Sequence, residues 1–535
     1  MPKTLGSLNI EDWLPGQNLP LLKKLVKPYK KYLRNIKGSV NCPPIQKLLP
    51  LLTDLEVSLT PDNLRALSLH PGFKRLNLHF GPDWRRKTSG RVLLMKYKTS
   101  LSSNLAKIKG LTSMSMTIKS EEVQAAHLML EIIDQNLSLD SLEQSSLDFV
   151  SGFFPSDFQK PLEQKTSIRN VLARLTHLSS DNSAWYSFLI SSGKLSNLSV
   201  LKLKLKLSSE EMDWGLKDLL QFHNLPKLKK FALDFNVPSF PSERAFFENF
   251  TLPSSLEDLS LTLTGFTLSL INDNDPVSCQ LFHRLQEAKS IKALNLKITE
   301  NTANLAFTAK FACLLIKCFG RLETLEYQNP KESSYFRKNN TEAEAIHLDF
   351  QEFWTAITPS KETLRSISVG VSEIIFPEDV NTLETGFPRL QKLHLQESVS
   401  SGGELGRFCQ KISSLRDLNL AAVKFQDEEK LKMFLDDMKE IPKWGDFDLS
   451  LDVEDIGQEP LIGCLKKYVE DVRIRGRLGI HFTGVRVEDK HAFREVLRMV
   501  VNKGRFNLFK VIMKNSRQLF SVTKFCVLRA EDGLI

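Results

Sequence analysis

Residues 198–207 read LSVLKLKLKL, a stretch in which an apolar residue is followed by two others, a second apolar residue, one other and a third apolar residue. The three apolar positions are Leu198, Leu201 and Leu203, and apolar and polar side chains continue to alternate beyond them. Alternation with a period of two places every second side chain on one face of a β-strand. One short strand cannot bury that face alone, whereas stacked copies can, so the fold depends on whether the pattern recurs.

The pattern recurs along the chain at intervals that average about 31 residues, one long interval left out, and such a period is typical of repeat arrays with a continuous core. The copies are Leu52-Leu55-Val57, Phe73-Leu76-Leu78, Leu111-Met114-Met116, Leu198-Leu201-Leu203, Leu228-Phe231-Leu233, Leu256-Leu259-Leu261, Ile291-Leu294-Leu296, Leu322-Leu325-Tyr327, Leu364-Ile367-Val369, Leu390-Leu393-Leu395 and Leu415-Leu418-Leu420, with weaker ones at Trp444-Phe447-Leu449, Val469-Val472-Ile474 and Phe506-Phe509-Val511. The long interval, between residues 118 and 198, predicts two degenerate copies, with Leu147-Phe149 and Leu172-Leu175 as candidates.

Stretches with the helical spacing of apolar residues separate the predicted strands. Residues 428–441 show this well, because Leu431, Phe434, Leu435 and Met438 fall along one stripe of a helix. A strand, a turn, a helix and a second turn fit within about 25–35 residues. The sequence therefore predicts an α/β fold with parallel strands on the inside and helices on the outside.

This repeat resembles that of the leucine-rich repeat family, well over residues 51–451 and weakly over the rest. The segments Leu225-Pro226-Lys227-Leu228 and Phe387-Pro388-Arg389-Leu390 are similar to the approach to the strand in intracellular, ribonuclease-inhibitor-like or F-box-associated members. The family often has Asn or Cys eight residues after the first Leu, and here Asn236 alone fits. The resemblance implies an irregular leucine-rich-repeat-like solenoid, with parallel strands on its concave face and helices on its convex face.

Charge is distributed unevenly along the chain. Residues 1–110 carry a net charge of +14, residues 111–460 one of −14 and residues 461–535 one of +9, which leaves +9 for the whole chain. From charge and pattern together we predict three parts. These are a basic amphipathic N-terminal helical cap at residues 1–50, the solenoid at residues 51–425, and basic C-terminal repeats or an α/β cap at residues 426–535.

The N-terminal cap is predicted from an amphipathic pattern. Its apolar face would carry Leu22, Leu25, Val26, Tyr29, Leu33 and Ile36. The residues for a possible contact with an anionic surface are Lys23, Lys24, Lys27, Lys30, Lys31 and Arg34. Such a helix can cap a repeat array, bind a partner or an anionic surface, or anchor to a membrane. Capping is the interpretation we favour, because the helix directly precedes the first repeat.

Residues between the apolar positions of each strand are predicted to line the concave face. Acidic and basic side chains are equally frequent among them, and they include no Phe, Tyr or Trp. A groove for single-stranded nucleic acid needs basic charge and aromatic platforms, so this face does not fit one. The contact surface is expected around residues 228–396, and the predicted partner-binding residues are Lys202, Lys204, Lys206, Asp234, Asn295, Lys297, Glu326, His394, Gln396, Arg473, Arg475 and Arg477.

The sequence contains no phosphate-binding glycine loop, zinc-protease helix or paired Cys motif. Cys313 and Cys318 are five residues apart on an expected helix, and we interpret them as core thiols. Seven scattered cysteines fit reduced thiols, and no apolar run approaches the roughly 20 residues of a membrane span. We therefore expect a cytoplasmic or nuclear protein that is not an enzyme and needs neither a cofactor nor a small-molecule ligand.

A strand-lined surface without catalytic motifs predicts a non-catalytic protein–protein interaction or scaffold protein that binds its partner on the concave face. One alternative is a ribonucleoprotein component that contacts RNA through its basic N- and C-terminal regions. Another is a substrate-recognition adaptor of a ubiquitin ligase. Salt dependence separates the first two hypotheses, because affinity that rests on phosphate contacts falls steeply with salt.

Overall fold

Parallel β-strands joined by helices and turns form the part of the chain that the computed structural model describes. The described residues are 7–9, 24, 27, 35–37, 53–59, 72–80, 95, 98–99, 101–103, 105–106, 108, 111–118, 131, 134–135, 144–149, 170, 173–180, 195–206, 222–236, 240–266, 276–300, 305–329, 347–371, 373–377, 379–383, 386–400, 403–424, 428–439, 447–454, 463, 476–483, 508–515, 518–523 and 527–530. Among the strands, β1, β2, β6 and β18 to β22 are described by their backbone alone. The chain divides into two compact units.

Unit 1 comprises residues 1–238 and 249–256. Its described residues form nine parallel strands, each paired with the next in chain order. The strands are β1 (Ser7–Asn9), β2 (Asn35–Lys37), β3 (Asp54–Leu59), β4 (Arg75–Phe80), β5 (Ser113–Ile118), β6 (Gln144–Phe149), β7 (His177–Ser180), β8 (Val200–Lys206) and β9 (Lys230–Asn236), and a short 3-10 helix, η5 (Phe222–Asn224), precedes β9.

Unit 2 comprises residues 239–248 and 257–535. Its main sheet is parallel and consists of β10 (Asp258–Phe266), β11 (Ala293–Glu300), β12 (Thr324–Gln328), β14 (Ser366–Gly370), β16 (Lys392–Ser400), β17 (Asp417–Lys424), β18 (Phe447–Glu454), β19 (Gly476–Thr483) and β20 (Leu508–Asn515). Two short strands, β13 (His347–Asp349) and β15 (Glu373–Ile375), pair with each other, and β15 also pairs with β16. After β20 the chain reverses, so that β21 (Gln518–Thr523) and β22 (Val527–Ala530) pair antiparallel.

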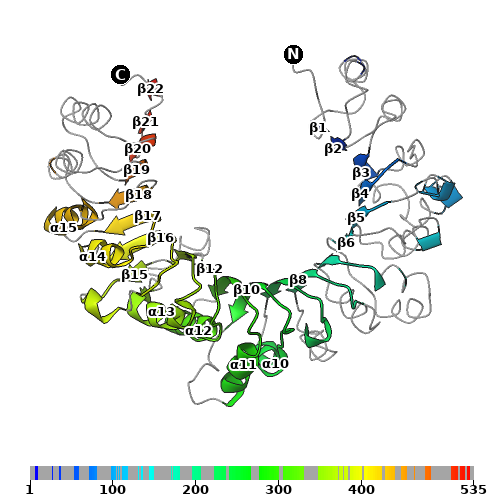
Figure 1. Ribbon diagram of the computed structural model, residues 1–535, viewed down its shortest axis with the longest axis horizontal. Helices are drawn as coiled ribbons and strands as arrows, with labels where there is room; N and C mark the ends of the chain where they lie inside the picture. Colours follow the sequence, from blue (N-terminus) through cyan, green and yellow to red (C-terminus); the bar gives the residue numbers. More distant parts are fainter. Residues whose placement is uncertain are drawn as a thin grey trace, which may run out of the picture. The chain divides into compact units, whose positions relative to one another are not determined.

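Helices cover one face of the sheet in unit 2. They are α10 (Phe240–Asn249), α11 (Pro276–Gln286), α12 (Leu305–Lys317), α13 (Phe350–Ile357), α14 (Gly403–Lys411) and α15 (Glu428–Lys439), with 3-10 turns η7 (Thr358–Ser360) and η8 (Val380–Thr382). In Figure 1, α11 to α14 lie on the same side of the neighbouring strands. The predicted helix at residues 428–441 is confirmed as α15, with Phe434 fully buried.

The core of unit 2 is a ladder of apolar side chains at equivalent positions. Its second apolar positions, in register across six strands and at most 2% exposed, are Leu259, Leu294, Leu325, Ile367, Leu393 and Leu418. Full burial of a Leu or Ile side chain contributes about 1.5–3 kcal/mol. The register is fixed by backbone bonds before each strand, as where the amides of Arg365 and Ser366 both donate to the carbonyl of Glu323 at 2.8 and 3.1 Å.

Most predicted copies of the pattern have the register that the sequence indicated, from Leu55 paired with Leu76 to Leu393 paired with Leu418. The degenerate copy at Leu147-Phe149 is confirmed as part of β6. The other degenerate copy was assigned three residues too early, because β7 buries Leu175, Leu178 and Ser180 rather than beginning from Leu172.

Two of the weaker C-terminal copies were also assigned to the wrong residues. In the pairing of β17 with β18, Leu418 lies opposite Leu449, so the copy at Trp444-Phe447-Leu449 is shifted by two positions. Leu449 in turn lies opposite Leu478 of β19, which excludes Val469-Val472-Ile474 as the copy in the ladder. The copy at Phe506-Phe509-Val511 is confirmed, since Phe509 and Val511 pair with Leu478 and Ile480.

The described part of the N-terminal 50 residues contains two short strands, β1 and β2. Ile36 was expected on the apolar face of the predicted helix, but it lies in β2 and pairs with Leu55. Pairing of β1 with β2 and of β2 with β3 extends the parallel ladder toward the N-terminus. Within the predicted helix, the structure describes Lys24 as helical and Lys27 as 3-10, both exposed.

Helices α14 and α15 pack closely around Gly406 and Asp437. A Cβ atom at Gly406 would lie 2.8 Å from the Asp437 Cβ and 3.0 Å from the carbonyl oxygen of Phe434. Asp437 Oδ2 is buried without a hydrogen bond, and its ion pair with Arg407 Nε spans 3.9 Å. Burial raises the pKa of the Asp437 carboxyl, an effect that Arg407 opposes and that Glu404 and Asp436 reinforce.

We expect Asp437→Asn to make stability less dependent on pH. A carboxyl whose pKa is higher in the folded than in the unfolded chain contributes stability below its unfolded pKa and loses that contribution as pH rises through its folded pKa. Wild type should therefore gain stability relative to the Asn variant between neutral pH and about pH 4. Urea unfolding of both proteins at neutral pH and at about pH 4 measures this change. The same difference in the free energy of unfolding between wild type and variant at both pH values would contradict the prediction.

Candidate functional site

A row of polar side chains runs across the face of the unit 2 sheet that is opposite the buried ladder. It consists of Ser260, Asn295, Glu326, Ser368, His394 and Asn419, which are paired in register from β10 through β11, β12, β14, β16 and β17. All six side chains are partly exposed, while the apolar residues that flank them along the strands, from Leu259 to Leu418, are buried. Five inter-strand steps of about 4.8 Å give this polar row a length of about 24 Å.

Glu326 is held in place near the centre of the polar row. Asn295 Nδ2 donates to Glu326 Oε2 at 3.0 Å, and Gln328 Nε2 donates to Glu326 Oε1 at 2.5 Å. With both oxygens engaged, the carboxylate has a fixed position and loses less side-chain entropy when a ligand binds. Glu326 and Asn295 were both predicted as partner-binding residues, and the structure brings them into direct contact.

A second charged group lies around His394. His394 Nε2 is 3.3 Å from Asp417 Oδ2, and Lys392 Nζ is 3.9 Å from the same oxygen. His394 Nε2 makes no hydrogen bond, so the two side chains approach closely without the geometry of a hydrogen bond. Both side chains are about one quarter exposed, at 28% and 27%, so they remain accessible from this face.

Charge on the described part of this face is close to balanced. Its acidic side chains are Asp258, Glu326 and Asp417, and its basic ones are Lys297 and Lys392, with His394 between the two groups. None of the described residues between Asp258 and Asn419 that lie on this face is Phe, Tyr or Trp. This composition offers hydrogen bonds and paired charges to a ligand rather than a basic track with stacking platforms.

The equivalent face of unit 1 carries the first predicted basic stripe. Lys202 and Lys204 are exposed on β8, and Lys204 Nζ forms a salt bridge of 3.3 Å with Asp234 Oδ2 on β9. Burial and, to a lesser extent, the charge of Lys202 lower the pKa of the neighbouring His177. Lys204 therefore offers less free charge than the sequence suggested, because Asp234 neutralises part of it.

The remaining predicted site residues are placed by their backbone or lie outside the described part of the chain. Lys206, Gln396 and Arg477 belong to β8, β16 and β19. Of the three arginines in the second predicted basic stripe, the structure describes Arg477 alone, in β19 (Gly476–Thr483). Lys23, Lys30, Lys31, Arg34, Arg473 and Arg475 lie outside the described residues.

The sequence interpretation missed a line of charges at the leading edge of the unit 2 sheet, meaning the residues just before each strand. Lys292 Nζ is 3.2 Å from Glu257 Oε2, and Arg365 Nε is 3.8 Å from Glu323 Oε2. Each of these four residues directly follows the first apolar position of its copy, and their charges alternate in sign. That alternation is a signal in the sequence that could have predicted the two pairs.

Buried thiols account for the cysteines that the structure describes with side chains. Cys313 and Cys409 are buried and Cys318 is partly buried, with its Sγ donating to the carbonyl of Leu314 at 3.3 Å. Burial raises the pKa of Cys318 to about 12 and also raises the pKa of Cys313 and Cys409. A thiolate is the reactive and metal-binding form, so these three thiols are poorly suited to either role at neutral pH.

Comparisons with known proteins add no family to this description. No protein-family model matches the chain, and no curated protein matches it. Within the described residues there is no cluster of three or more His, Cys, Asp or Glu side chains that could hold a metal ion. No helix in the described part of the chain has the length and apolar character needed to cross a membrane.

Proposed function

We propose that the protein is a non-catalytic, leucine-rich-repeat-like scaffold of the cytoplasm or nucleus that binds a protein partner on the strand-lined face of its parallel sheet. The observation that carries the proposal is the polar row, in which six partly exposed side chains keep strict register. A surface about 24 Å long is sufficient for a helix, a loop or an extended segment of a partner.

The composition of this face supports a protein partner over a nucleic acid. The carboxylates of Glu326 and Asp417 can accept hydrogen bonds from a partner, and the ammonium of Lys392 can donate them. A rigid surface binds with less loss of entropy than one that must order on binding. The strands supply that rigidity, because every strand from β11 to β19 in the main sheet of unit 2 has a paired neighbour on both sides.

A second candidate function is the binding of RNA through the basic N-terminal part of the chain. The +14 charge of residues 1–110 supports it, and Lys24, Lys27, Lys74 and Arg75 are exposed there. Contacts of this kind act on phosphates and lose affinity steeply as the salt concentration rises. The two proposals therefore predict different responses to nuclease and to salt.

The test places two arginines on the polar row. We expect the double variant Ser260→Arg and Ser368→Arg to bind its major partner at least about tenfold more weakly. The two long arginine side chains would cover the polar row and place positive charge where the wild-type row is neutral. The control is Gln280→Arg with Gln351→Arg, which adds the same charge on exposed helix positions of α11 and α13. Affinity capture with each protein, followed by titration of the captured partner, measures the effect.

Two outcomes of the capture would contradict the first proposal. One is retention of the partner by the polar-row variant at wild-type affinity. The other is loss of the partner from wild type on nuclease treatment, which would favour RNA bound through the basic ends. Equal loss from the control variant would assign the contact to the helix surface.

A further inference from the structure

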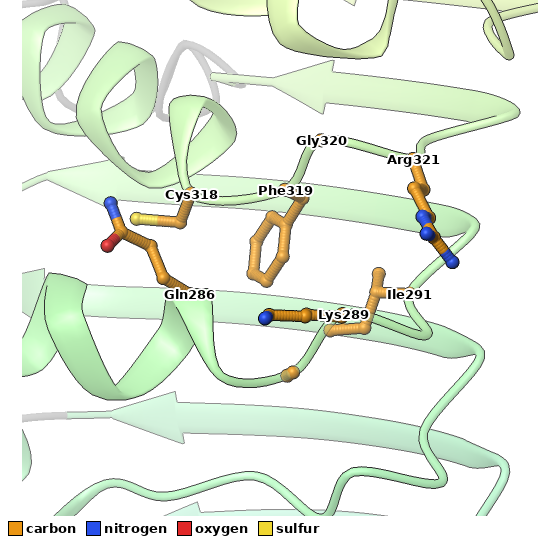
Figure 2. Close-up of a pocket in the computed structure, with 8 residues that line it drawn as sticks. Gln286, Lys289, Ile291, Cys318, Phe319, Gly320 and Arg321 are labelled. Atoms are coloured by element: carbon orange, nitrogen blue, oxygen red, sulfur yellow. The ribbon is translucent and has the colours of Figure 1, made fainter.

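A small hollow opens at the leading edge of unit 2, between the approaches to β11 and β12. It has a volume of about 260 Å³ and is lined by Gln286, Ala288, Lys289, Ile291, Cys318, Phe319, Gly320 and Arg321. Figure 2 shows the Phe319 ring between the two turns, with Gln286 and Cys318 to one side and Ile291 and Arg321 to the other. The hollow lies outside the polar row and shares no residue with it.

The walls of the hollow are fixed by hydrogen bonds within its two turns. The amide of Ala288 donates to the carbonyl of Leu285 at 3.1 Å, and the amide of Phe319 donates to the carbonyl of Ile316 at 3.0 Å. The Ser360 hydroxyl of the next repeat donates to the carbonyl of Phe319 at 2.7 Å. Ala288, Ile291 and Phe319 are themselves at most 3% exposed, so the apolar lining is part of the packed core.

The charges of the hollow have one sign. Lys289 and Arg321 are exposed, and neither side chain forms a hydrogen bond or a salt bridge with any described residue. None of the eight lining residues is Asp or Glu. Lys292 and Arg365, on the same leading edge, are instead paired with Glu257 and Glu323. The cations at the hollow are therefore available to an anionic partner.

Size decides what kind of occupant the hollow can take. Pockets for drug-sized ligands measure about 300–1,000 Å³, and this hollow is smaller. It has room for a single apolar side chain, which would pack mainly on the aliphatic parts of Gln286, Lys289 and Arg321, because Ala288, Ile291 and Phe319 are almost fully buried. Successive parallel strands are about 4.8 Å apart, and residues two apart in an extended segment are about 6.8 Å apart, so neighbouring acidic side chains can reach both Lys289 and Arg321.

We propose that this hollow is a docking site for an acidic segment of a partner protein, which inserts one aliphatic side chain and places flanking carboxylates on Lys289 and Arg321. Charge complementarity carries the choice of occupant, because two unpaired cations frame an apolar lining. The inference is independent of the proposed function, since it needs neither the polar row nor its partner.

The test uses a labelled peptide in which one Leu stands between two pairs of Glu. Two matched probes replace the Glu residues by Gln, or the Leu by Ser. We expect the acidic Leu peptide to bind wild type in fluorescence anisotropy, with each matched probe at least about tenfold weaker. Lys289→Glu combined with Arg321→Glu should weaken the acidic peptide by at least about tenfold, because both attractions become repulsions.

The control variant is Arg389→Glu combined with Lys432→Glu, which makes the same change in net charge at exposed positions before β16 and on α15, neither of which lines the hollow. It should retain binding within about twofold, since long-range charge effects are screened at physiological salt. Circular dichroism verifies that both double variants are folded. Because all four positions are exposed, neither variant removes a packed side chain.

Several results would overturn the proposal. They are absence of binding by wild type at millimolar peptide, equal binding by the hollow variant, and equal binding of the peptide with Ser in place of Leu. Stronger binding of a uridine oligonucleotide than of the acidic peptide, lost in the same variant, would assign the two cations to nucleic acid instead. Loss of the polar-row partner leaves this result unaffected, so the two proposals can fail separately.

Discussion

Replacing Trp354 with Ala is expected to lower the free energy of unfolding of unit 2 by about 3–5 kcal/mol. Trp354 is 1% exposed and packs against the aromatic rings of Phe350, Phe387 and Phe408. Its ring centroid lies 5.3 Å from that of Phe350, and 4.7 Å from those of Phe387 and Phe408. Phe376 closes the cluster by packing on Phe350 and Phe408.

The loss has two physical causes. Ala removes the apolar area that the indole buries, and it leaves a cavity that the surrounding rings can fill only in part. The rings come from α13, α14 and the approach to β16, so the cavity weakens the packing between these elements. Trp354→Phe should recover much of the stability, because it keeps an aromatic ring in the same place.

Urea unfolding followed by circular dichroism measures this effect. Gln351→Ala on the same helix is the matched control, because Gln351 is exposed and its substitution should change stability by less than about 0.5 kcal/mol. Repeat arrays can unfold in more than one step, so the transition assigned to unit 2 is the one to compare. A loss below about 1 kcal/mol for Trp354→Ala would show that this cluster does not hold the repeats together.

Replacing Ser360 with Val is expected to cost about 2–4 kcal/mol, because Val has no hydroxyl and adds a methyl group at a buried position. Ser360 is 1% exposed, and its hydroxyl bridges two buried backbone groups of the turn at residues 319–322, which precedes β12. It donates to the carbonyl of Phe319 at 2.7 Å and accepts from the amide of Leu322 at 3.0 Å. Val would leave both groups buried without this partner, which costs about 1–3 kcal/mol for each.

The substitution should also have a measurable local effect at the Leu322 amide, in addition to the loss of overall stability. Hydrogen exchange at the Leu322 amide should become faster in Ser360→Val, because the amide loses its acceptor. Thr355→Val is the control, since its hydroxyl also donates to a backbone carbonyl, that of Gln351, but at an exposed site. Unchanged stability with unchanged exchange at Leu322 would contradict the role assigned to Ser360.

The sequence predicted the strands well wherever three apolar residues mark each copy. It failed at β7 because Ser180, 3% exposed, occupies the third apolar position and hides the pattern. At β18 the four alternating residues Phe447, Leu449, Leu451 and Val453 fit more than one register, and only pairing with β17 selects Leu449 and Leu451. At β19 the first position of the copy is Arg475 rather than an apolar residue, so the apolar run Val469-Val472-Ile474 fits the pattern better than the strand itself does.

The candidate site was predictable in part. The alternation along each strand placed Asn295, Glu326 and His394 on the same face, and the structure brings them into one row. The pairing of Lys204 with Asp234 depends on side-chain conformations that spacing does not determine. The hollow was not predictable, because its lining residues come from two chain segments, before β11 and before β12, that meet only in the folded chain.

The central claim is that the partner binds on the polar row, and carboxyl footprinting of the complex tests it most directly. We predict that Glu326 and Asp417 become protected from modification when the partner binds, because both lie on that face. Exposed carboxylates on helices, such as Glu248 of α10 and Glu429 of α15, should keep their reactivity. Protection of the helix carboxylates with Glu326 and Asp417 unchanged would contradict the account.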